Sequence, residues 1–236
     1  MRSSVRRVTD ERRRTDHSRG ARLEADTRVA DDILSALPAR SGHFLLESGH
    51  HTDLWLTLDA LFVEPAAVAP LVAALADKLR PHMVTAICGP LLGGAFLAQA
   101  LAEAMGARFY YTEPAPGSAA SGLFAAAYRL PAEQRRRIRG ERVAVVDDLI
   151  SAGSSTRATI AEVKDADASA IAVGTLLVLG DEGLAHFSQQ RVPIEMLGQR
   201  AFNLWKPADC PLCRSDRPVE DLASPNAPSG RRTSRG

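Results

Sequence analysis

Apolar residues recur along most of the chain at the spacings of helices and strands. Val29, Ile33, Leu34 and Leu37 have helical spacing, and Pro38 ends the helix that they predict. Short strand-like runs follow at 43–47 and 53–58. From there the pattern predicts a helix at 65–79, a strand at 83–88, a turn at 89–94, a helix at 95–105, strands at 108–112 and 142–146, a helix at 154–166, a strand at 170–179, a helix at 182–190 and a strand at 192–197.

Strands that alternate with helices are typical of an α/β domain. Each strand–helix–strand unit makes a right-handed crossover, so successive strands lie parallel in one sheet. The strands at 83–88, 142–146 and 170–179 are almost entirely apolar, as expected for strands that are buried on both faces. The sequence therefore predicts a mostly parallel, twisted sheet that is flanked by helices.

Both ends of the chain lack this pattern. Residues 1–26 are polar and charge-mixed, and residues 215–236 are rich in Pro, Ser, Gly and Arg. We interpret both segments as disordered tails, which leaves one domain at 27–214. A basic N-terminal arm that contacts nucleic acid is the less favoured alternative.

Composition argues against nucleic-acid-binding, membrane-spanning, secreted and disulfide-rich proteins. The chain has 236 residues, of which 45% are hydrophobic, and its formal net charge of +1 gives no sign of a nucleic-acid or membrane partner. No apolar run reaches the roughly 20 residues of a membrane span, and no apolar stretch follows the Arg-rich N-terminus as in a secretory signal. Three cysteines are too few for a disulfide framework, so we expect a cytoplasmic protein.

The run RVAVVDDLISAGSSTRATI at 142–160 carries the clearest chemistry. Val143 to Val146 lead directly into Asp147 and Asp148, at the carboxyl end of a strand, where parallel sheets bind ligands. Small and hydroxyl residues at 151–155 then precede a helix, whose first N–H groups favour an anion. The two carboxylates can accept hydrogen bonds from vicinal hydroxyls or hold Mg²⁺. A ribose 5-phosphate unit offers both a diol and a phosphate.

This run resembles the phosphoribosyl diphosphate signature of type I phosphoribosyltransferases. The resemblance implies that family's fold, a Mg²⁺ cofactor carried by the substrate, and catalytic roles for Asp147 and Asp148 as ligands of the ribose hydroxyls. A loop that binds pyrophosphate through backbone amides is expected in GPLLGG. The residues assigned to phosphoribosyl diphosphate are Asp147, Asp148, Leu149, Ile150, Ser151, Ala152, Gly153, Ser154, Ser155, Gly89, Gly93 and Gly94.

A second stretch, GHFLLESGHHTDLWLTLDAL at 42–61, resembles the N-terminal hood of orotate phosphoribosyltransferases. The resemblance covers roughly residues 28–218 and implies transfer of a phosphoribosyl group to orotate, with release of pyrophosphate. It further implies a homodimer, while the near-neutral charge and the lack of a long apolar run predict no nucleic-acid or membrane partner. The residues that it places at the base are Phe44, Ser48, Gly49 and Ser151.

The sequence departs from the family pattern where cations are expected. Gly180 and Asp181 follow the strand at 170–179, where an Arg usually contacts the orotate carboxylate, and the mobile catalytic loop at 113–127 is poor in Lys and Arg. We predict that Arg129, where this loop rejoins the sheet, is the catalytic cation that reaches the orotate carboxylate instead. The alternatives are a phosphoribosyltransferase for another base and a non-catalytic regulator that senses phosphoribosyl diphosphate.

Cys210 and Cys213 supply half of a zinc site, but the chain has no second C-x-x-C pair. A reduced pair in a turn is the favoured interpretation, and a zinc site shared across a dimer is the alternative. For His50 and His51 we favour an ordinary surface turn over a role near the base.

Overall fold

The computed structural model describes residues 29, 31–35, 37–115 and 123–221. Residues 29 and 31–35 are helical, in agreement with the predicted helix before Pro38. The predicted tail at 1–26, residues 222–236 of the predicted tail at 215–236, and residues 116–122 of the predicted mobile loop lie outside the described residues.

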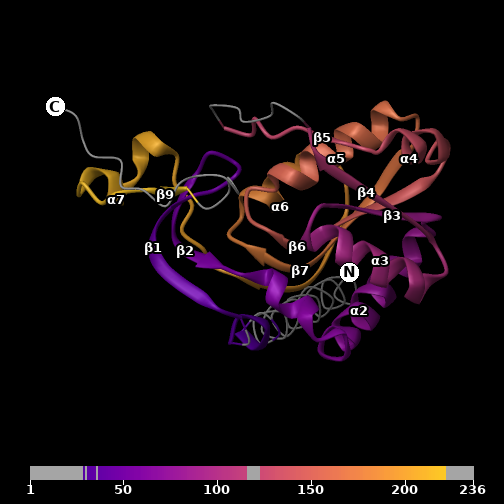
Figure 1. The fold of residues 1–236 in the computed structure, drawn as a ribbon, viewed down its shortest axis with the longest axis horizontal. Coiled ribbons are helices and arrows are strands. Elements are labelled where there is room, and N and C mark those ends of the chain that lie inside the picture. Colours follow the sequence, from indigo (N-terminus) through magenta and orange to yellow (C-terminus); the bar gives the residue numbers. More distant parts are fainter. Residues whose placement is uncertain (1–28, 30, 36, 116–122, 222–236) are drawn as a thin grey trace, which may run out of the picture.

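A six-stranded sheet forms the centre of the molecule (Figure 1). Its strand order is β5-β4-β3-β6-β7-β8, and every pair is parallel except β4 with β5. This arrangement confirms the predicted, mostly parallel sheet. The strands are β3 (Ala86–Pro90), β4 (Arg108–Pro114), β5 (Tyr128–Arg129), β6 (Arg142–Ile150), β7 (Ser169–Leu179) and β8 (Ile194–Arg200).

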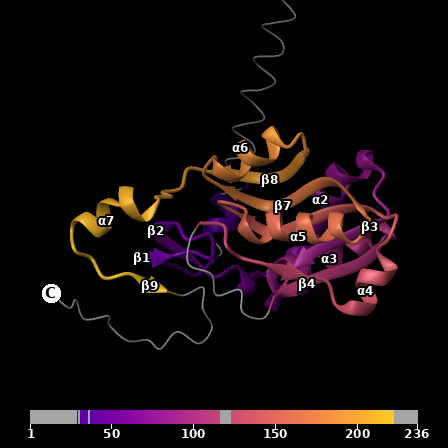
Figure 2. The same cartoon turned by 90° about the horizontal axis from the view of Figure 1, so that it is seen from above.

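Helices cover both faces of this sheet (Figures 1 and 2). Neighbouring residues of a strand point to opposite faces, and apolar strand residues on each face pack against these helices. On one face Leu75 and Leu97 pack in the same cluster as Val146; on the other, Val163 packs in the cluster of Val145. The helices are α2 (Pro65–Leu79), α3 (Gly93–Met105), α4 (Ala132–Arg137), α5 (Ser154–Asp165), α6 (Glu182–Gln189) and α7 (Pro211–Arg214), with 3₁₀ turns η1 (Leu58–Val63), η2 (Arg80–His82) and η3 (Pro207–Asp209).

A smaller sheet stands beside the main one and forms the hood (Figure 2). Strands β1 (Ala39–Leu45) and β2 (His51–Leu56) pair antiparallel, and β9 (Glu220–Asp221) pairs parallel with β1. The described chain continues past the predicted domain boundary at residue 214 and includes β9. β9 has only two residues, both charged, so the sequence shows no alternation of apolar and polar residues that would predict this strand.

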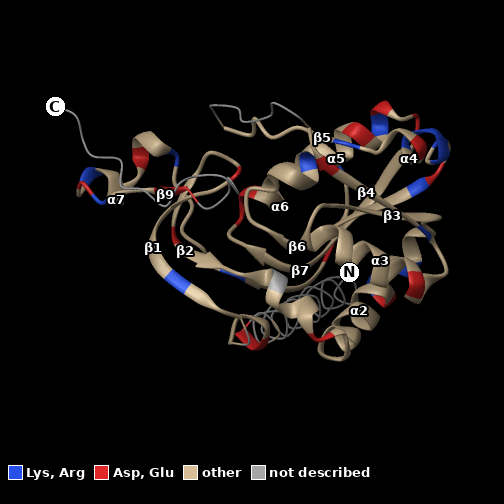
Figure 3. Ribbon diagram, viewed as in Figure 1, with Lys and Arg blue, Asp and Glu red and all other residues tan. Residues whose placement is uncertain are grey.

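The basic run at 135–139 forms ion pairs within the domain. Arg135 pairs with Glu162, and Arg139 pairs with Asp167 at 3.1 Å. Acidic residues lie among the basic ones along the ribbon around α4 (Figure 3). No helix in the described part of the chain is long and apolar enough to cross a membrane.

Candidate active site

The two acids lie within a strand rather than at the start of a loop. β6 was predicted to end at Val146, but Asp147 pairs with Thr175 of β7, and the pairing continues to Ile150. A short bend at 151–153 follows, and α5 begins at Ser154. Gly153 has a φ of 74°, a left-handed conformation that favours glycine and turns the chain into the helix. The predicted strand, loop and helix start are thus confirmed, with a later boundary.

Asp147 is buried, with 5% of its surface exposed. Its Oδ2 accepts hydrogen bonds from the hydroxyls of Ser155 at 2.7 Å and Thr156 at 3.1 Å. Burial raises the pKa of Asp147 well above its ordinary value, and the neighbouring Asp148 raises it further, while the two hydroxyls act in the opposite direction. The carboxylate therefore fixes the first turn of α5 onto the end of β6.

Asp148 is less buried and lies against the other predicted loop. Its Oδ1 accepts the Leu149 N–H at 2.8 Å. A Cβ on Gly93 would collide with the Asp148 carboxylate, and a Cβ on Gly89 would collide with the Gly94 carbonyl. The glycines thus allow the turn at 89–94 to close against the acids, and the two predicted ligand loops meet in space.

Each loop ends at the start of a helix. α3 begins at Gly93 and α5 at Ser154, so each loop leads into a helix start, where the first N–H groups have no acceptor one turn earlier in the helix. The Ser154 hydroxyl is buried and has no hydrogen-bond partner among the described residues. Ile150 and Ala152 are buried, so neither residue offers surface to a ligand in this conformation. This arrangement suits a phosphate held by backbone amides and hydroxyls.

The hood turn lies between β1 and β2. Gly49 has a φ of 76°, and the Ser48 carbonyl accepts the Phe124 N–H at 3.0 Å. The ring of His50 contacts that of Phe124, with centroids 5.4 Å apart. Phe44, by contrast, is fully buried beside Trp55, so this conformation does not offer it to a base. Its ring fills the interior of the hood, and the role of Phe44 at the base stays a prediction.

A cation that sequence reasoning missed lies beside the hood turn. The Arg157 guanidinium stacks 4.0 Å from the centre of the Phe124 ring. Its Nε and Nη2 atoms are buried and have no hydrogen-bond partner among the described residues. Burial lowers the pKa of Arg157, and nearby Glu182 partly offsets the effect. Arg157 lies about one turn after Ser154 in α5, so both residues lie on the same side of the helix. This spacing from the predicted phosphate loop is the feature of the sequence that points to Arg157 as a site residue.

The other candidate cation, Arg129, lies at the edge of the sheet. It is exposed in β5 and pairs in register with Glu113 of β4. The neighbouring Tyr128 hydroxyl donates to Glu47 of the hood at 2.8 Å. The segment that carries Arg129 is therefore linked to the hood, but its catalytic role stays a prediction.

The chain is similar in sequence to orotate phosphoribosyltransferases, although no protein-family model matches it. Orotate phosphoribosyltransferase of Wolinella succinogenes is 29% identical over 193 residues, which cover 76% of this chain and 88% of that protein. The same-named protein of Caldanaerobacter subterraneus subsp. tengcongensis is 30% identical over 181 residues, or 75% of this chain and 86% of that protein.

Solved structures share the fold at lower identity. Orotate phosphoribosyltransferase from Aeropyrum pernix matches with a TM-score of 0.54 and 18% identity over 73% of this chain and 92% of that one. Adenine phosphoribosyltransferase from Rhodothermus marinus matches with a TM-score of 0.57 and 18% identity over 73% of this chain and 99% of that one. Proteins of this fold thus act on more than one base, so the fold alone does not identify the base, and the residues of the site must do so.

Proposed function

Because the chain belongs to the orotate phosphoribosyltransferase family, we propose that it transfers the phosphoribosyl group of phosphoribosyl diphosphate to orotate and releases pyrophosphate. It is accordingly a glycosyltransferase of pyrimidine nucleotide biosynthesis. The observation that supports this activity most strongly is the meeting of the glycine turn at 89–94 with the carboxylates that precede α5.

The two acids have different roles in this proposal. Asp148, the more exposed, accepts hydrogen bonds from the ribose hydroxyls. Asp147 is committed to Ser155 and Thr156 and holds the phosphate loop in place. Residues 151–155 bind the 5-phosphate, and the turn at 89–94 binds the pyrophosphate that leaves. As the bond to pyrophosphate breaks, positive charge grows at ribose C1, and the nearby carboxylates stabilise it.

Arg157 is our candidate for the orotate carboxylate. Nε and Nη2 lie on one edge of the guanidinium and together form a fork that matches a carboxylate. Both atoms are buried and have no partner in the described residues, so an incoming carboxylate would satisfy them. The hood turn with Ser48 and Gly49, together with Ser151, would enclose the same ligand. Arg129 would then close over the pyrophosphate rather than the base.

We further propose that the enzyme uses Mg²⁺, works as a homodimer and acts in the cytoplasm. The carboxylate oxygens of the acidic motif are the hard ligands that Mg²⁺ prefers, and we assign Asp148, beside the pyrophosphate turn, as its contact with the protein. When bound, the ion supplies charge neutralisation for the departing pyrophosphate.

A base panel tests this function. The purified chain is mixed with phosphoribosyl diphosphate, Mg²⁺ and either orotate, uracil, adenine or no base, and pyrophosphate release is followed. Release that requires orotate is the expected result. Release with a different base would make the chain a phosphoribosyltransferase of another specificity. Binding of phosphoribosyl diphosphate without release in any mixture would instead indicate a sensor.

A further inference from the structure

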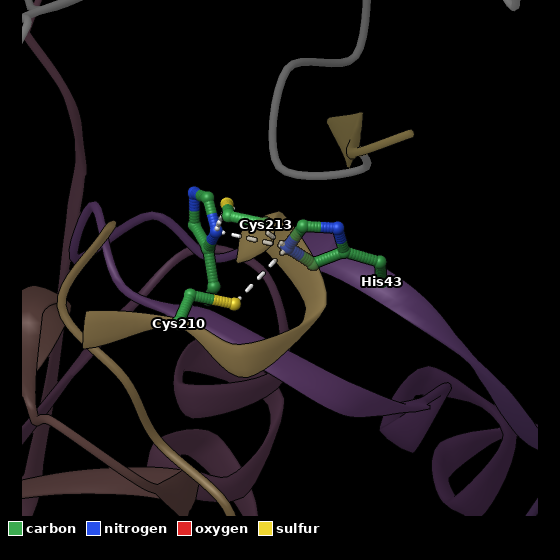
Figure 4. A group of neighbouring side chains, drawn as sticks. His43, Cys210 and Cys213 are labelled. Carbon is green, nitrogen blue, oxygen red and sulfur yellow. Dashed lines mark hydrogen bonds between the residues drawn. The ribbon is translucent and has the colours of Figure 1, made fainter. Parts of the chain in front are cut away.

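Four potential metal ligands from distant parts of the sequence converge at the hood. His43 lies in β1, His51 begins β2, and Cys210 and Cys213 flank the start of α7. Their ligand atoms all lie within 4.8 Å of one another. Figure 4 shows His43 directed at the two sulfur atoms. The C-x-x-C pair is therefore not an isolated half-site, and the missing ligands are histidines of the hood hairpin.

The distances in this cluster fit a tetrahedral ion. His43 Nε2 lies 3.4 Å from Cys210 Sγ and 3.7 Å from Cys213 Sγ, and His51 Nδ1 lies 3.3 Å from Cys213 Sγ. Bonds of about 2.3 Å to sulfur and about 2.0–2.1 Å to nitrogen in a tetrahedron separate sulfur from nitrogen by about 3.6 Å. The two ring nitrogens are 2.9 Å apart and would need to separate by a few tenths of an ångström.

A backbone contact prepares His43 for metal binding. Its Nδ1 lies 2.8 Å from the Arg217 carbonyl oxygen, which can only accept a hydrogen bond. Nδ1 therefore carries the proton in the neutral ring, and the lone pair of Nε2 points at the other three ligands. This second contact is the usual way in which proteins orient a histidine ligand.

The cluster lies between two places where the C-terminal segment pairs with the hood. Trp205 exchanges backbone hydrogen bonds with His51 at 2.8 and 2.9 Å, and β9 pairs with β1 beyond the cysteines. Cys210 is 0% exposed, and both histidines are below a tenth exposed. Four protein ligands in a buried setting leave no open position for a substrate, so the cluster suits a structural ion.

We propose that His43, His51, Cys210 and Cys213 bind a structural Zn²⁺ that fastens the C-terminal segment to the hood. Binding displaces the two thiol protons to solvent, so that two thiolates and two neutral imidazoles give an overall uncharged site. Nitrogen and sulfur ligands in a tetrahedron select zinc over Mg²⁺, which prefers oxygen. The ion is thus distinct from the Mg²⁺ of the proposed reaction.

The site has a consequence for the base pocket. The hairpin that supplies both histidines also carries the Ser48–Gly49 turn beside Phe124. By holding β1 and β2 to residues 205–221, the ion would keep this turn in position. Loss of zinc should therefore loosen the hood while the parallel sheet stays intact.

Metal analysis of the untagged full-length chain tests the proposal without any substrate, so its result is independent of the proposed reaction. We expect about one zinc per chain by mass spectrometry of the dissolved metal. Cys213→Ser should lower this content at least about fivefold. Cys88→Ala and His82→Gln are matched controls outside the cluster and should keep full zinc. Zinc content unaffected by Cys213→Ser would overturn the assignment.

Cobalt provides a second measurement that needs no variant. Zinc is removed with a chelator and Co²⁺ is added to the wild-type chain. Intense visible bands of tetrahedral Co²⁺ with thiolate charge-transfer bands are the expected result. Hydrogen exchange of the metal-free chain should rise in 39–56 and 205–221 but not in 142–179. Absence of both zinc and the cobalt spectrum would overturn the proposal and leave the four side chains as a directly hydrogen-bonded cluster.

Discussion

Replacing Arg157 with leucine tests recognition of the orotate carboxylate separately from the binding of phosphoribosyl diphosphate. Leucine keeps an apolar stem near Phe124 but removes the fork of Nε and Nη2. In the ligand-free protein these atoms have no hydrogen-bond partner in the described residues, so the substitution breaks no internal hydrogen bond there. It does remove the stacking of the guanidinium on Phe124, which is worth about 0.5–2 kcal/mol.

The size of the effect follows from the lost contact. A hydrogen bond to a charged group contributes about 1.5–3 kcal/mol, and each 1.4 kcal/mol corresponds to about a factor of ten. We therefore expect Arg157→Leu to lower kcat/KM for orotate by about ten- to hundredfold. Arg157→Lys keeps the charge without the fork and should recover part of this loss.

Steady-state kinetics and calorimetry check the prediction together. The Kd for phosphoribosyl diphosphate should stay within about twofold, because the fork serves the base. Arg139→Leu, which removes an exposed arginine paired with Asp167, is the matched control and should keep wild-type kinetics. Unchanged kcat/KM for orotate in Arg157→Leu would refute the reasoning. A fall in melting temperature beyond about 10 °C, which is more than loss of the stacking on Phe124 explains, would show that Arg157 serves stability instead.

Three further predictions concern the acids and the loop cation. Asp148→Asn should weaken phosphoribosyl diphosphate binding at least about tenfold in calorimetry; an unchanged Kd would exclude the ribose contact. The folded pKa of Asp147 lies above its unfolded value of about 3.9, so its ionisation costs stability as pH rises above about 4. Asp147→Asn should thus melt higher than wild type at pH 7 and equally below about pH 4; lower melting at pH 7 would contradict this. Arg129→Ala should lower kcat with orotate about tenfold or more while the KM for orotate stays unchanged; a loss confined to the KM would assign Arg129 to the base.

The main sheet could be predicted from sequence because its signals are local. Val143 to Val146 form a continuous apolar run, and the acids and glycine that follow stand at fixed spacing. Both the strand and the ligand loop are encoded within one short stretch. The end of β6 was misplaced because its last residues are polar or follow polar ones, and pairing with β7 decides their conformation.

Several features of the hood could not be predicted from the local sequence, because they depend on contacts between distant parts of the chain. β9 has two charged residues and exists because β1 offers it an edge. His43 and Cys210 are separated by most of the domain, so their convergence depends on tertiary structure. His51 was interpreted as a surface residue, yet it is only 7% exposed, since Trp205 pairs with its backbone. The family pattern does not predict Arg157, because it places the cation for orotate after β7 rather than on α5.

Identification of the reaction products tests the central claim most directly. The purified chain is incubated with phosphoribosyl diphosphate, orotate and Mg²⁺, and the mixture is resolved by liquid chromatography and mass spectrometry. Formation of orotidine 5-phosphate and pyrophosphate in equal amounts, and their absence when either substrate is omitted, is the predicted result. If the chain binds phosphoribosyl diphosphate but orotate is not consumed, the claim is contradicted.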